Sequence, residues 1–211
     1  MIDAAVILAG GRGSRLAPWP APKCLLPVNG ISIIEHLIAH VEPHVKRVIV
    51  CVGYRAGDVE RALRKREEVR FSNAGEDAAM GARLFQARGD HRIEGRALVL
   101  YGDELNDVDV NKLVEAHEAR GALLTFTGYN YTLPFGTVRG GQIGIDESLL
   151  INIGYAIVEP SCWQWGSAED GFAEMVNRVS EATGRTFCYV HEGKRATINN
   201  LRDLSAAESQ W

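Results

Sequence analysis

A glycine-rich turn follows the first apolar run of the chain. Residues 4–9 are AAVILA, and residues 10–13, GGRG, come directly after them. A strand that ends in such a turn lets backbone N–H groups approach phosphate oxygens that a Cβ atom would hold at a distance. The turn is neither a P-loop nor a dinucleotide-binding fingerprint, because the Lys-Ser/Thr pair is absent and Gly10 and Gly13 have the wrong spacing. It is therefore predicted to bind a triphosphate.

Two cations follow this turn. Arg15 lies two residues after Gly13, and Lys23 stands in the segment APKCLLPV of residues 21–28. An arginine can bind two phosphate oxygens with its planar fork, whereas a lysine supplies a mobile point charge. Either residue alone is typical of a solvated surface. Together, directly after a phosphate-binding turn, they are predicted to hold a polyphosphate and to stabilise the charge on a reacting phosphoryl group.

A carboxylate ends another apolar run further along the chain. Residues 98–101 are LVLY, and Gly102 and Asp103 follow them. In an α/β sheet the ligand lies beyond the carboxyl ends of the strands, so Asp103 is expected to face the same crevice as the glycine-rich turn. A hard cation that bridges phosphate oxygens needs an oxygen ligand there, and Asp103 is the predicted one. Its acidic neighbours Glu104, Asp107 and Asp109 are expected to cap or solvate the next helix.

The elements that must position these residues alternate between short β-branched runs and amphipathic stretches, which predicts parallel strands joined by crossover helices. Strands are expected at 4–9, 47–52, 69–72, 96–101, 123–127, 149–158 and 186–190. Helices are expected at 32–41, 56–67, 78–88, 110–120 and 168–183. The fold class is thus α/β, a Rossmann-like three-layer sandwich with a mostly parallel sheet. Residues 129–146, rich in glycine, break this rhythm and are expected to form hairpins in a small subdomain.

Composition sets further limits on the class of protein. The 211 residues are 46% hydrophobic and 24% charged, which is typical of a globular chain able to form one core. A net charge of -4 supplies no basic field for nucleic acid or anionic lipid. No apolar run reaches the roughly 20 residues of a membrane span, and the N-terminus lacks a charged leader. Four scattered cysteines indicate buried, reduced thiols, and a cytoplasmic location is expected.

The motifs resemble a known family. Residues 8–16, LAGGRGSRL, and residues 22–30, PKCLLPVNG, resemble the signature of the sugar-1-phosphate nucleotidylyltransferases, which make NDP-sugars. The likeness continues through VGY at 52–54, AMGARL at 79–84, YGD at 101–103 and INIGY at 151–155. The motif style is similar to glucose-1-phosphate cytidylyltransferases, and the length is similar to short heptose or mannose-1-phosphate guanylyltransferases.

The resemblance implies a Mg²⁺-dependent transfer of NMP from an NTP to a sugar 1-phosphate, with release of pyrophosphate. CTP and GTP are the favoured nucleotides, and neither nucleic acid nor a membrane is expected as a partner. One nucleotidyltransferase domain would span residues 1–211, with a nucleotide-binding part at 1–128 and an acceptor-binding part at 129–211 that carries the second metal ligand. The oligomeric state stays open, with a homodimer among the alternatives.

The resemblance also assigns roles to residues. Arg15 would hold the leaving phosphates, and Lys23 would stabilise the α-phosphoryl group. The nucleotide-binding residues would be Leu8, Gly10, Gly11, Gly13 and Gly81. The Mg²⁺ ligands would be Asp103 and Asn199, where the family usually has a second aspartate, although Asn199 could instead be a helix cap. The acceptor-binding residues would be Gly136 and Asn152.

One departure from the family concerns the acceptor. Members commonly carry a Glu-Lys-Pro segment whose lysine holds the sugar phosphate, but residues 145–149 here are IDESL. Arg139 is a candidate replacement. A non-sugar acceptor such as phosphocholine, or an inactive regulatory homologue that binds nucleotide sugars, are the alternatives that this departure leaves open. An NAD(P)-dependent oxidoreductase is disfavoured by the spacing of the glycine-rich turn.

Overall fold

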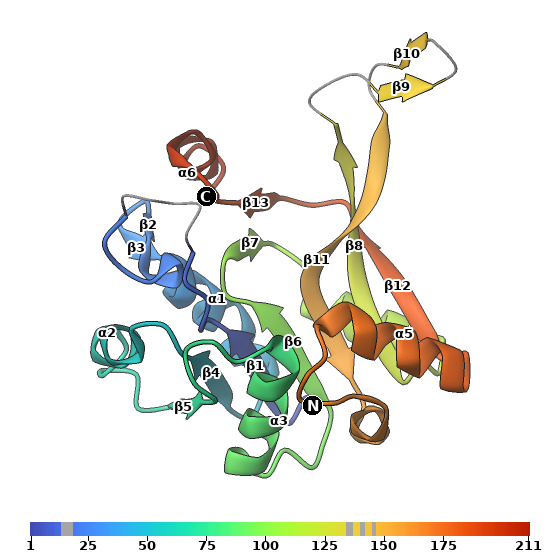
Figure 1. Cartoon of the computed structure of the whole chain (residues 1–211), viewed down its shortest axis with the longest axis horizontal. Coiled ribbons are helices and arrows are strands. Elements are labelled where there is room, and N and C mark those ends of the chain that lie inside the picture. The colour runs from blue at the N-terminus through green and yellow to red at the C-terminus, as the bar shows by residue number, and fades with distance from the viewer. Residues whose placement is uncertain (14–18, 134–136, 140–141, 145–146) are drawn as a thin grey trace.

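A seven-stranded mixed sheet forms the centre of the molecule in this computed structural model, which describes residues 1–13, 19–133, 137–139, 142–144 and 147–211 (Figure 1). The strand order is β12-β8-β11-β6-β1-β4-β5. The strands are β1 (Ala4–Leu8), β4 (Val48–Val52), β5 (Val69–Asn73), β6 (Ala97–Tyr101), β8 (Leu124–Thr132), β11 (Ser148–Val158) and β12 (Thr186–His191). Only β11 runs antiparallel to its neighbours, so the predicted α/β class with a mostly parallel sheet is confirmed.

Helices cover both faces of this sheet. The helices are α1 (Ile33–Val41), α2 (Ala56–Ala62), α3 (Met80–His91), α4 (Val110–Ala119), α5 (Phe172–Thr183) and α6 (Leu201–Glu208). Short 3-10 turns lie at η2 (Lys23–Leu25), η3 (Glu42–His44) and η4 (Pro160–Trp165). Buried residues of α1, α2, α4 and α6 belong to one hydrophobic cluster, and those of α3, α5 and η4 belong to the other. The sheet therefore separates two helical layers.

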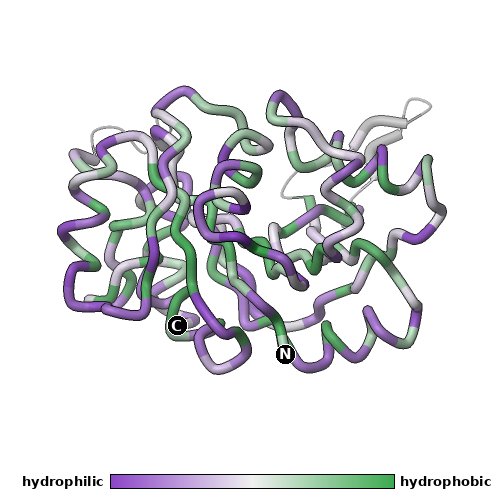
Figure 2. Tube along the Cα trace, turned by 90° about the horizontal axis from the view of Figure 1, so that it is seen from below, coloured by the Kyte–Doolittle hydropathy of each residue, from purple (hydrophilic) through white to green (hydrophobic). Residues whose placement is uncertain are grey.

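Alternation along the strands divides the core between these layers. In β1, Ala5 and Ile7 join the cluster of α1, whereas Ala4 and Val6 join the cluster of α3. Successive side chains of a strand point to opposite faces, and a strand covered on both faces is apolar throughout. Figure 2 shows hydrophobic residues along the inner segments and hydrophilic residues mainly outside. The continuous apolar runs of the sequence thus correspond to strands that are buried on both sides.

A two-stranded arm projects from the sheet where the sequence predicts hairpins. Strands β8 and β11 extend beyond the sheet, and β9 (Thr137–Arg139) pairs with β10 (Gln142–Gly144) near the tip (Figure 1). Two smaller ribbons lie closer to the body. They are β2 (Pro27–Val28) with β3 (Ile31–Ser32), and β7 (Glu104–Asn106) with β13 (Arg195–Thr197).

The chain reverses direction across the sheet at β1. From β1 it continues outward to β4 and β5, and it then returns to β6 on the other side of β1. The carboxyl ends of β1 and β6 thus lie side by side at the point where the strand order reverses, which is the usual place for a ligand in an open α/β sheet. The glycine-rich turn follows β1, and Asp103 follows β6. The topology thus brings together the residues that the sequence singled out.

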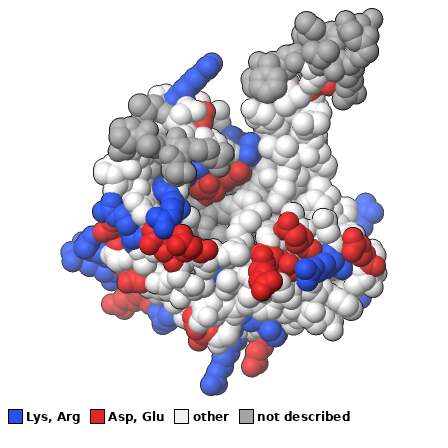
Figure 3. Space-filling model, in the orientation of Figure 1, with Lys and Arg blue, Asp and Glu red and all other residues white. Residues whose placement is uncertain are grey.

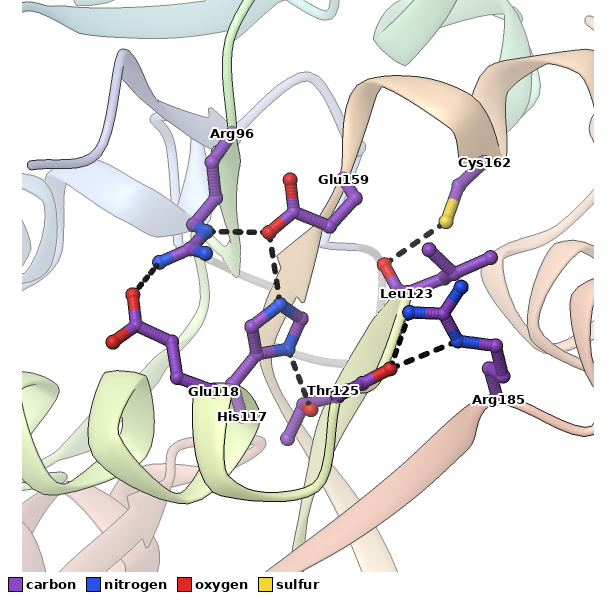
Figure 4. A network of polar contacts seen from close by, with 9 residues as sticks. Arg96, His117, Glu118, Leu123, Thr125, Glu159, Cys162 and Arg185 are labelled. Atoms are coloured by element: carbon purple, nitrogen blue, oxygen red, sulfur yellow. Dashed lines mark hydrogen bonds and ion pairs between the residues drawn. The ribbon is translucent and has the colours of Figure 1, made fainter.

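A polar network fixes the other end of the central strands, away from the carboxyl ends of β1 and β6 (Figure 4). Arg96 Nε donates to Glu159 Oε1 at 2.6 Å, and Arg96 Nη1 donates to Glu118 Oε1 at 2.8 Å. His117 Nε2 lies 3.0 Å from the same oxygen of Glu159, and its Nδ1 lies 2.8 Å from Thr125 Oγ1. Burial lowers the pKa of His117. The network joins β6, α4, β8 and the end of β11, and Thr125 is fully buried, which indicates a structural role.

Candidate active site

A cavity of about 620 Å³ opens at the crevice between β1 and β6. The glycine-rich turn forms one wall, and residues 101–104 with Thr197 and Asn199 form another. The remaining wall consists of Glu76, Asp77, Ala78, Met80 and Arg83. Figure 3 shows a hollow on this face between the body and the projecting arm, with side chains of both charges inside it. The residues predicted from the strand ends therefore lie around one cavity.

Close backbone packing explains the glycines of the cavity. A Cβ atom on Gly102 would lie 2.8 Å from the carbonyl oxygen of Leu8, because the end of β6 lies against the end of β1. Gly13 has a φ of +60°, which favours glycine, and a Cβ atom there would lie 2.8 Å from Cβ of Lys23. Four of the positions predicted to bind the nucleotide line the cavity, namely Leu8, Gly10, Gly11 and Gly13.

Lys23 points into the cavity from a short turn. Leu25 N–H donates to the carbonyl of Pro22, and Leu26 N–H donates to the carbonyl of Lys23, so the backbone folds back at this position. The side chain is only 8% exposed. Its Nζ donates to Asp103 Oδ2 at 2.9 Å and to Asn199 Oδ1 at 3.3 Å. One ammonium group thus joins segments that are 80 and 176 residues away in the sequence.

Asn199 is free to face the cavity because its neighbour caps the following helix. Asn200 is the N-cap of α6 and accepts a hydrogen bond from Asp203 N–H. Asp203 in turn accepts from the backbone N–H of Asn199. These two bonds fix the segment from β13 to α6, and the Asn199 side chain bonds to Lys23 instead. The alternative interpretation, that Asn199 is only a helix cap, is therefore wrong.

Glu104 has a different environment from the one that the sequence predicts. It is buried and pairs with Arg195 through Nε and Nη2, each at 3.1 Å, so it does not cap or solvate the next helix. Burial raises the pKa of Glu104, and the charge of Arg195 opposes this shift. Asp109 does cap α4, by accepting from the N–H groups of Asn111 and Lys112. The sequence around Glu104 could not predict this ion pair, because Arg195 lies 91 residues further along the chain.

Arg195 also borders a second cavity. This cavity of about 340 Å³ lies between the base of the arm and α6, and it shares Thr197 and Asn199 with the first cavity. Arg195 stacks over the ring of Tyr129, with Cζ 5.8 Å from the ring centroid. The sequence analysis did not single out Arg195, although its position four residues before Asn199 was a local signal.

The predicted acceptor residues are placed as follows. Asn152 lies in β11 at an irregularity in its pairing with β8, and its Nδ2 donates to Tyr101 Oη at 3.2 Å. Tyr101 lines the first cavity and packs on Gly154, which has a φ of +72°. Asn152 is thus linked to the cavity through Tyr101. Gly136 and the side chain of Arg139 lie outside the part of the chain that the structure describes.

Two other predicted positions lie away from the cavity or outside the described chain. Gly81 lies behind the wall, where its N–H donates to the carbonyl of Asp170 at 2.8 Å, and it does not border the cavity. A Cβ atom on Gly81 would lie 2.3 Å from the carbonyl oxygen of Ser167, so close packing accounts for this glycine. Arg15 lies outside the described residues.

Arg12 ties the glycine-rich turn to the opposite wall. Its Nη1 lies 2.6 Å from Glu76 Oε1, and its Nη2 lies 2.9 Å from Asp77 Oδ1. The guanidinium also lies over the ring of Tyr54, with Cζ 5.4 Å from the centroid. All of these side chains except Tyr54 border the cavity. The sequence analysis missed this contact, because nothing local predicts that the loop after β5 closes on the turn after β1.

Comparisons with known proteins agree with this geometry. The family model described as a MobA-like NTP transferase domain matches residues 5–139. Glucose-1-phosphate cytidylyltransferase of Salmonella typhimurium is 25% identical over 98% of this chain and 95% of its own length. The bifunctional protein GlmU of Methanococcus maripaludis is 28% identical over 69% of this chain and 34% of its own length.

Solved structures share the fold. HddC from Yersinia pseudotuberculosis has a TM-score of 0.79 at 22% identity, and 99% of each chain is covered. The same protein complexed with GMP-PN has a TM-score of 0.76 at 19% identity and the same coverage.

Among the described residues, no helix has both the length and the apolar character that crossing a membrane requires.

Proposed function

The chain belongs to the family of MobA-like NTP transferase domains, and we propose that it transfers NMP from an NTP to a sugar 1-phosphate, giving an NDP-sugar and pyrophosphate. The observation that carries the proposal is the convergence of Asp103 and Asn199 on the Lys23 ammonium in the crevice after β1. The similarity to a glucose-1-phosphate cytidylyltransferase along nearly the whole chain supports a sugar 1-phosphate as the acceptor.

The residues of the cavity fit a magnesium ion. Asp103 Oδ2 and Asn199 Oδ1 both lie within hydrogen-bond distance of one cation, the ammonium of Lys23. Mg²⁺ prefers oxygen ligands and is commonly held by one or two side chains together with substrate phosphates and water. Asp103 and Asn199 would hold the ion in this way. When bound, Mg²⁺ supplies charge neutralisation for the phosphate oxygens of the NTP.

Lys23 is the side chain proposed to act on the reacting phosphorus. Its stem packs beside Gly13, and its ammonium reaches the carboxyl end of β6. An oxygen of the acceptor phosphate attacks the α-phosphorus, the bond from the α-phosphorus to the bridging oxygen breaks, and pyrophosphate leaves with that electron pair. Lys23 stabilises the charge on the α-phosphoryl group during this exchange. Arg15 is proposed to hold the β- and γ-phosphates.

The acceptor needs no general base from the protein. The second pKa of a phosphomonoester is near 6, so a sugar 1-phosphate is already an anionic nucleophile at neutral pH. Catalysis then depends on in-line placement and on charge stabilisation. This requirement suits a cavity that brings Lys23 together with Asp103 and Asn199.

We assign the acceptor to the side of the cavity formed by the second half of the chain. The second cavity adjoins the first at Thr197 and Asn199, and Arg195 borders it. This arginine, which pairs with Glu104, places a guanidinium at the border of the second cavity. Asn152 and Gly136 are proposed to contact the acceptor itself. Residues 1–128 would then bind the nucleotide. Residues 129–211 would bind the acceptor and supply the second ligand of the metal.

A substrate panel tests the proposal. The protein is incubated with Mg²⁺, one of ATP, CTP, GTP, UTP or dTTP, and a sugar 1-phosphate or phosphocholine, and pyrophosphate release is measured. We expect release with CTP or GTP and one sugar 1-phosphate. Pyrophosphate release with phosphocholine alone would contradict a sugar 1-phosphate as the acceptor and would identify a non-sugar phosphate instead. Binding of an NTP without release for any acceptor in the panel would favour a regulatory homologue and contradict the proposal.

A further inference from the structure

A short ribbon connects the two residues proposed to hold the metal. Strand β7 begins directly after Asp103, and β13 ends two residues before Asn199. The two strands are antiparallel, and their register places Glu104 opposite Thr197 and Leu105 opposite Ala196. The alignment of the two strands therefore determines how far apart the side chains of Asp103 and Asn199 lie.

The backbone of this ribbon does not secure its register. Each strand has three residues, and the pair is separate from the seven-stranded sheet. A two-stranded ribbon is marginally stable by itself. The strands are not joined by a hairpin turn, because β8, β11 and β12 lie between them in the chain, so no turn fixes which residues are paired.

The apolar pattern leaves the register open as well. Leu105 is buried opposite Ala196, and Ile198, two residues further along, is also buried. Because side chains alternate between the two faces, a slip by two residues would keep the same residues on the core face and would place Ile198 opposite Leu105. Such a slip would move Asn199 by about 7 Å relative to Asp103, at 3.4 Å per residue.

An ion pair between the strands opposes this slip. Glu104 and Arg195 lie diagonally across the ribbon, and Nε and Nη2 of Arg195 donate to the two carboxylate oxygens of Glu104, each at 3.1 Å. Both side chains are only 11% exposed. A guanidinium that binds both oxygens fixes orientation as well as distance. A slip would separate two buried charges that then lack partners, which is strongly unfavourable.

Other contacts anchor the ribbon and its arginine to the neighbouring strands. Arg195 stacks over the ring of Tyr129 in β8, and Nδ2 of Asn106 donates to the carbonyl of Ile153 in β11 at 3.3 Å. At the outer end, Asp107 accepts from the backbone N–H of Lys194 at 2.6 Å. Glu104 lies at the other end, where it borders the first cavity beside Asp103. The ion pair thus acts at the end of the ribbon that carries the metal ligands.

We propose that Glu104 and Arg195 are positioning residues, whose ion pair fixes the register of the β7–β13 ribbon and so holds the oxygens of Asp103 and Asn199 where one divalent cation can bind both. Both oxygens of Glu104 are bound to Arg195, so Glu104 acts through the backbone of its neighbour and not as a third ligand. The inference rests on the proposed function and adds to it the residues that support its metal site.

Binding of Mn²⁺ to the protein without nucleotide tests this role, with the free ion measured by electron paramagnetic resonance. The variants are Arg195→Lys, which removes the fork, and Glu104→Gln/Arg195→Met, which removes both charges. Neither variant changes the net charge of the site, so the Coulomb attraction for a cation stays the same. We expect the dissociation constant of Mn²⁺ to rise about 10- to 100-fold in both, the range found for residues that orient metal ligands.

Two controls accompany these variants. Arg96→Lys is the matched one, because it removes a similar fork, to Glu159 and Glu118, at the other end of the central strands. It should lower Tm and leave the affinity for Mn²⁺ unchanged, as would Arg195→Lys if Arg195 were only structural. Asp103→Asn should remove most of the binding and thereby identify the ion as one bound at this site.

The outcomes separate this inference from the proposed function. If the folded variants bind Mn²⁺ within about threefold of the wild type, or more tightly, the ion pair does not position the ligands, and the proposed function stands. If the wild type shows no Mn²⁺ binding that Asp103→Asn removes, the inference fails. Pyrophosphate release in the substrate panel then decides the proposed function separately.

Amide hydrogen exchange of the wild type provides the test if neither variant folds. A metal ion that needs the paired ribbon must stabilise it when bound. Saturating Mg²⁺ should therefore slow the exchange of the β7 and β13 amides. Unchanged exchange in both strands would overturn the inference.

Discussion

Replacement of Lys23 by methionine should abolish most of the activity. The substitution keeps an unbranched stem beside Gly13 and removes the ammonium that contacts Asp103 and Asn199. Loss of one preorganised group that stabilises transition-state charge costs about 100- to 1,000-fold in kcat, equivalent to about 3 to 4 kcal/mol. The burial of Lys23 supports a large value, because water cannot readily replace its charge there.

The fold should tolerate this substitution. The side chain of Asp103 is 42% exposed, so water can solvate its carboxylate after the ion pair is lost. Because methionine leaves no buried charge behind and the remaining carboxylate is solvated, loss of the pair should cost about 1 kcal/mol, which corresponds to a change in Tm of about 2 to 4 °C for a chain of this size. A large loss of activity together with a small change in Tm would therefore separate catalysis from folding.

The assay is the initial rate of pyrophosphate release with the preferred NTP and acceptor, combined with thermal unfolding. Lys46→Met is the matched control, because Lys46 is 60% exposed and lies 3.7 Å from Asp3, before β4 and away from the cavity. We expect the control to keep the wild-type rate. A folded Lys23→Met variant with a kcat within threefold of the wild type would refute the role assigned to Lys23.

Three further changes test other parts of the account. Asn199→Asp should keep or raise the Mg²⁺ affinity measured from rates at varied Mg²⁺, and an unchanged dependence would show that residue 199 is not a ligand. Gly102→Ala should lower the free energy of unfolding in urea by about 1 to 3 kcal/mol, because the added Cβ would meet the backbone at the end of β1. The control Gly89→Ala should be neutral or stabilising, because a Cβ at this position of α3 would point into open space. Burial holds the pKa of His117 below its usual value of 6.5. As pH falls through this range, the unfolded chain therefore binds more protons than the folded chain does. The contribution of His117 to stability is present above pH 6.5 and is lost toward acid. His117→Gln should therefore flatten the fall of Tm between about pH 7.5 and 5.5, and an unchanged slope would contradict this assignment.

Local patterns predicted the main elements well because the strands are buried on both faces. Each apolar run of the sequence became a strand with ends within one or two residues of those expected, except that the strand expected at 123–127 continues to Thr132 as β8. Ser32 forms the capping box that begins α1. The helix expected at 56–67 ends at Ala62 instead. The segment after Leu63 has no apolar residue that could pack on the core until Val69, so charged residues alone do not extend the helix.

Pairing over long distances was the part that the sequence could not supply. The order of the strands depends on pairings that no local pattern encodes, such as that of Tyr155 in β11 with Leu100 in β6. The same holds for the site. The positions of Lys23, Asp103 and Asn199 followed from motifs, whereas the pairing of Glu104 with Arg195 required the tertiary structure.

The central claim is nucleotidyl transfer in the crevice between β1 and β6, and ³¹P NMR of the complete reaction tests it most directly. The wild type is mixed with Mg²⁺, the preferred NTP and a sugar 1-phosphate, and all phosphorus species are followed together. We predict that the NTP and the sugar 1-phosphate disappear in equal amounts while pyrophosphate and an NDP-sugar appear in equal amounts. Conversion of the NTP without an equal amount of NDP-sugar, or no conversion with any acceptor, would contradict the account.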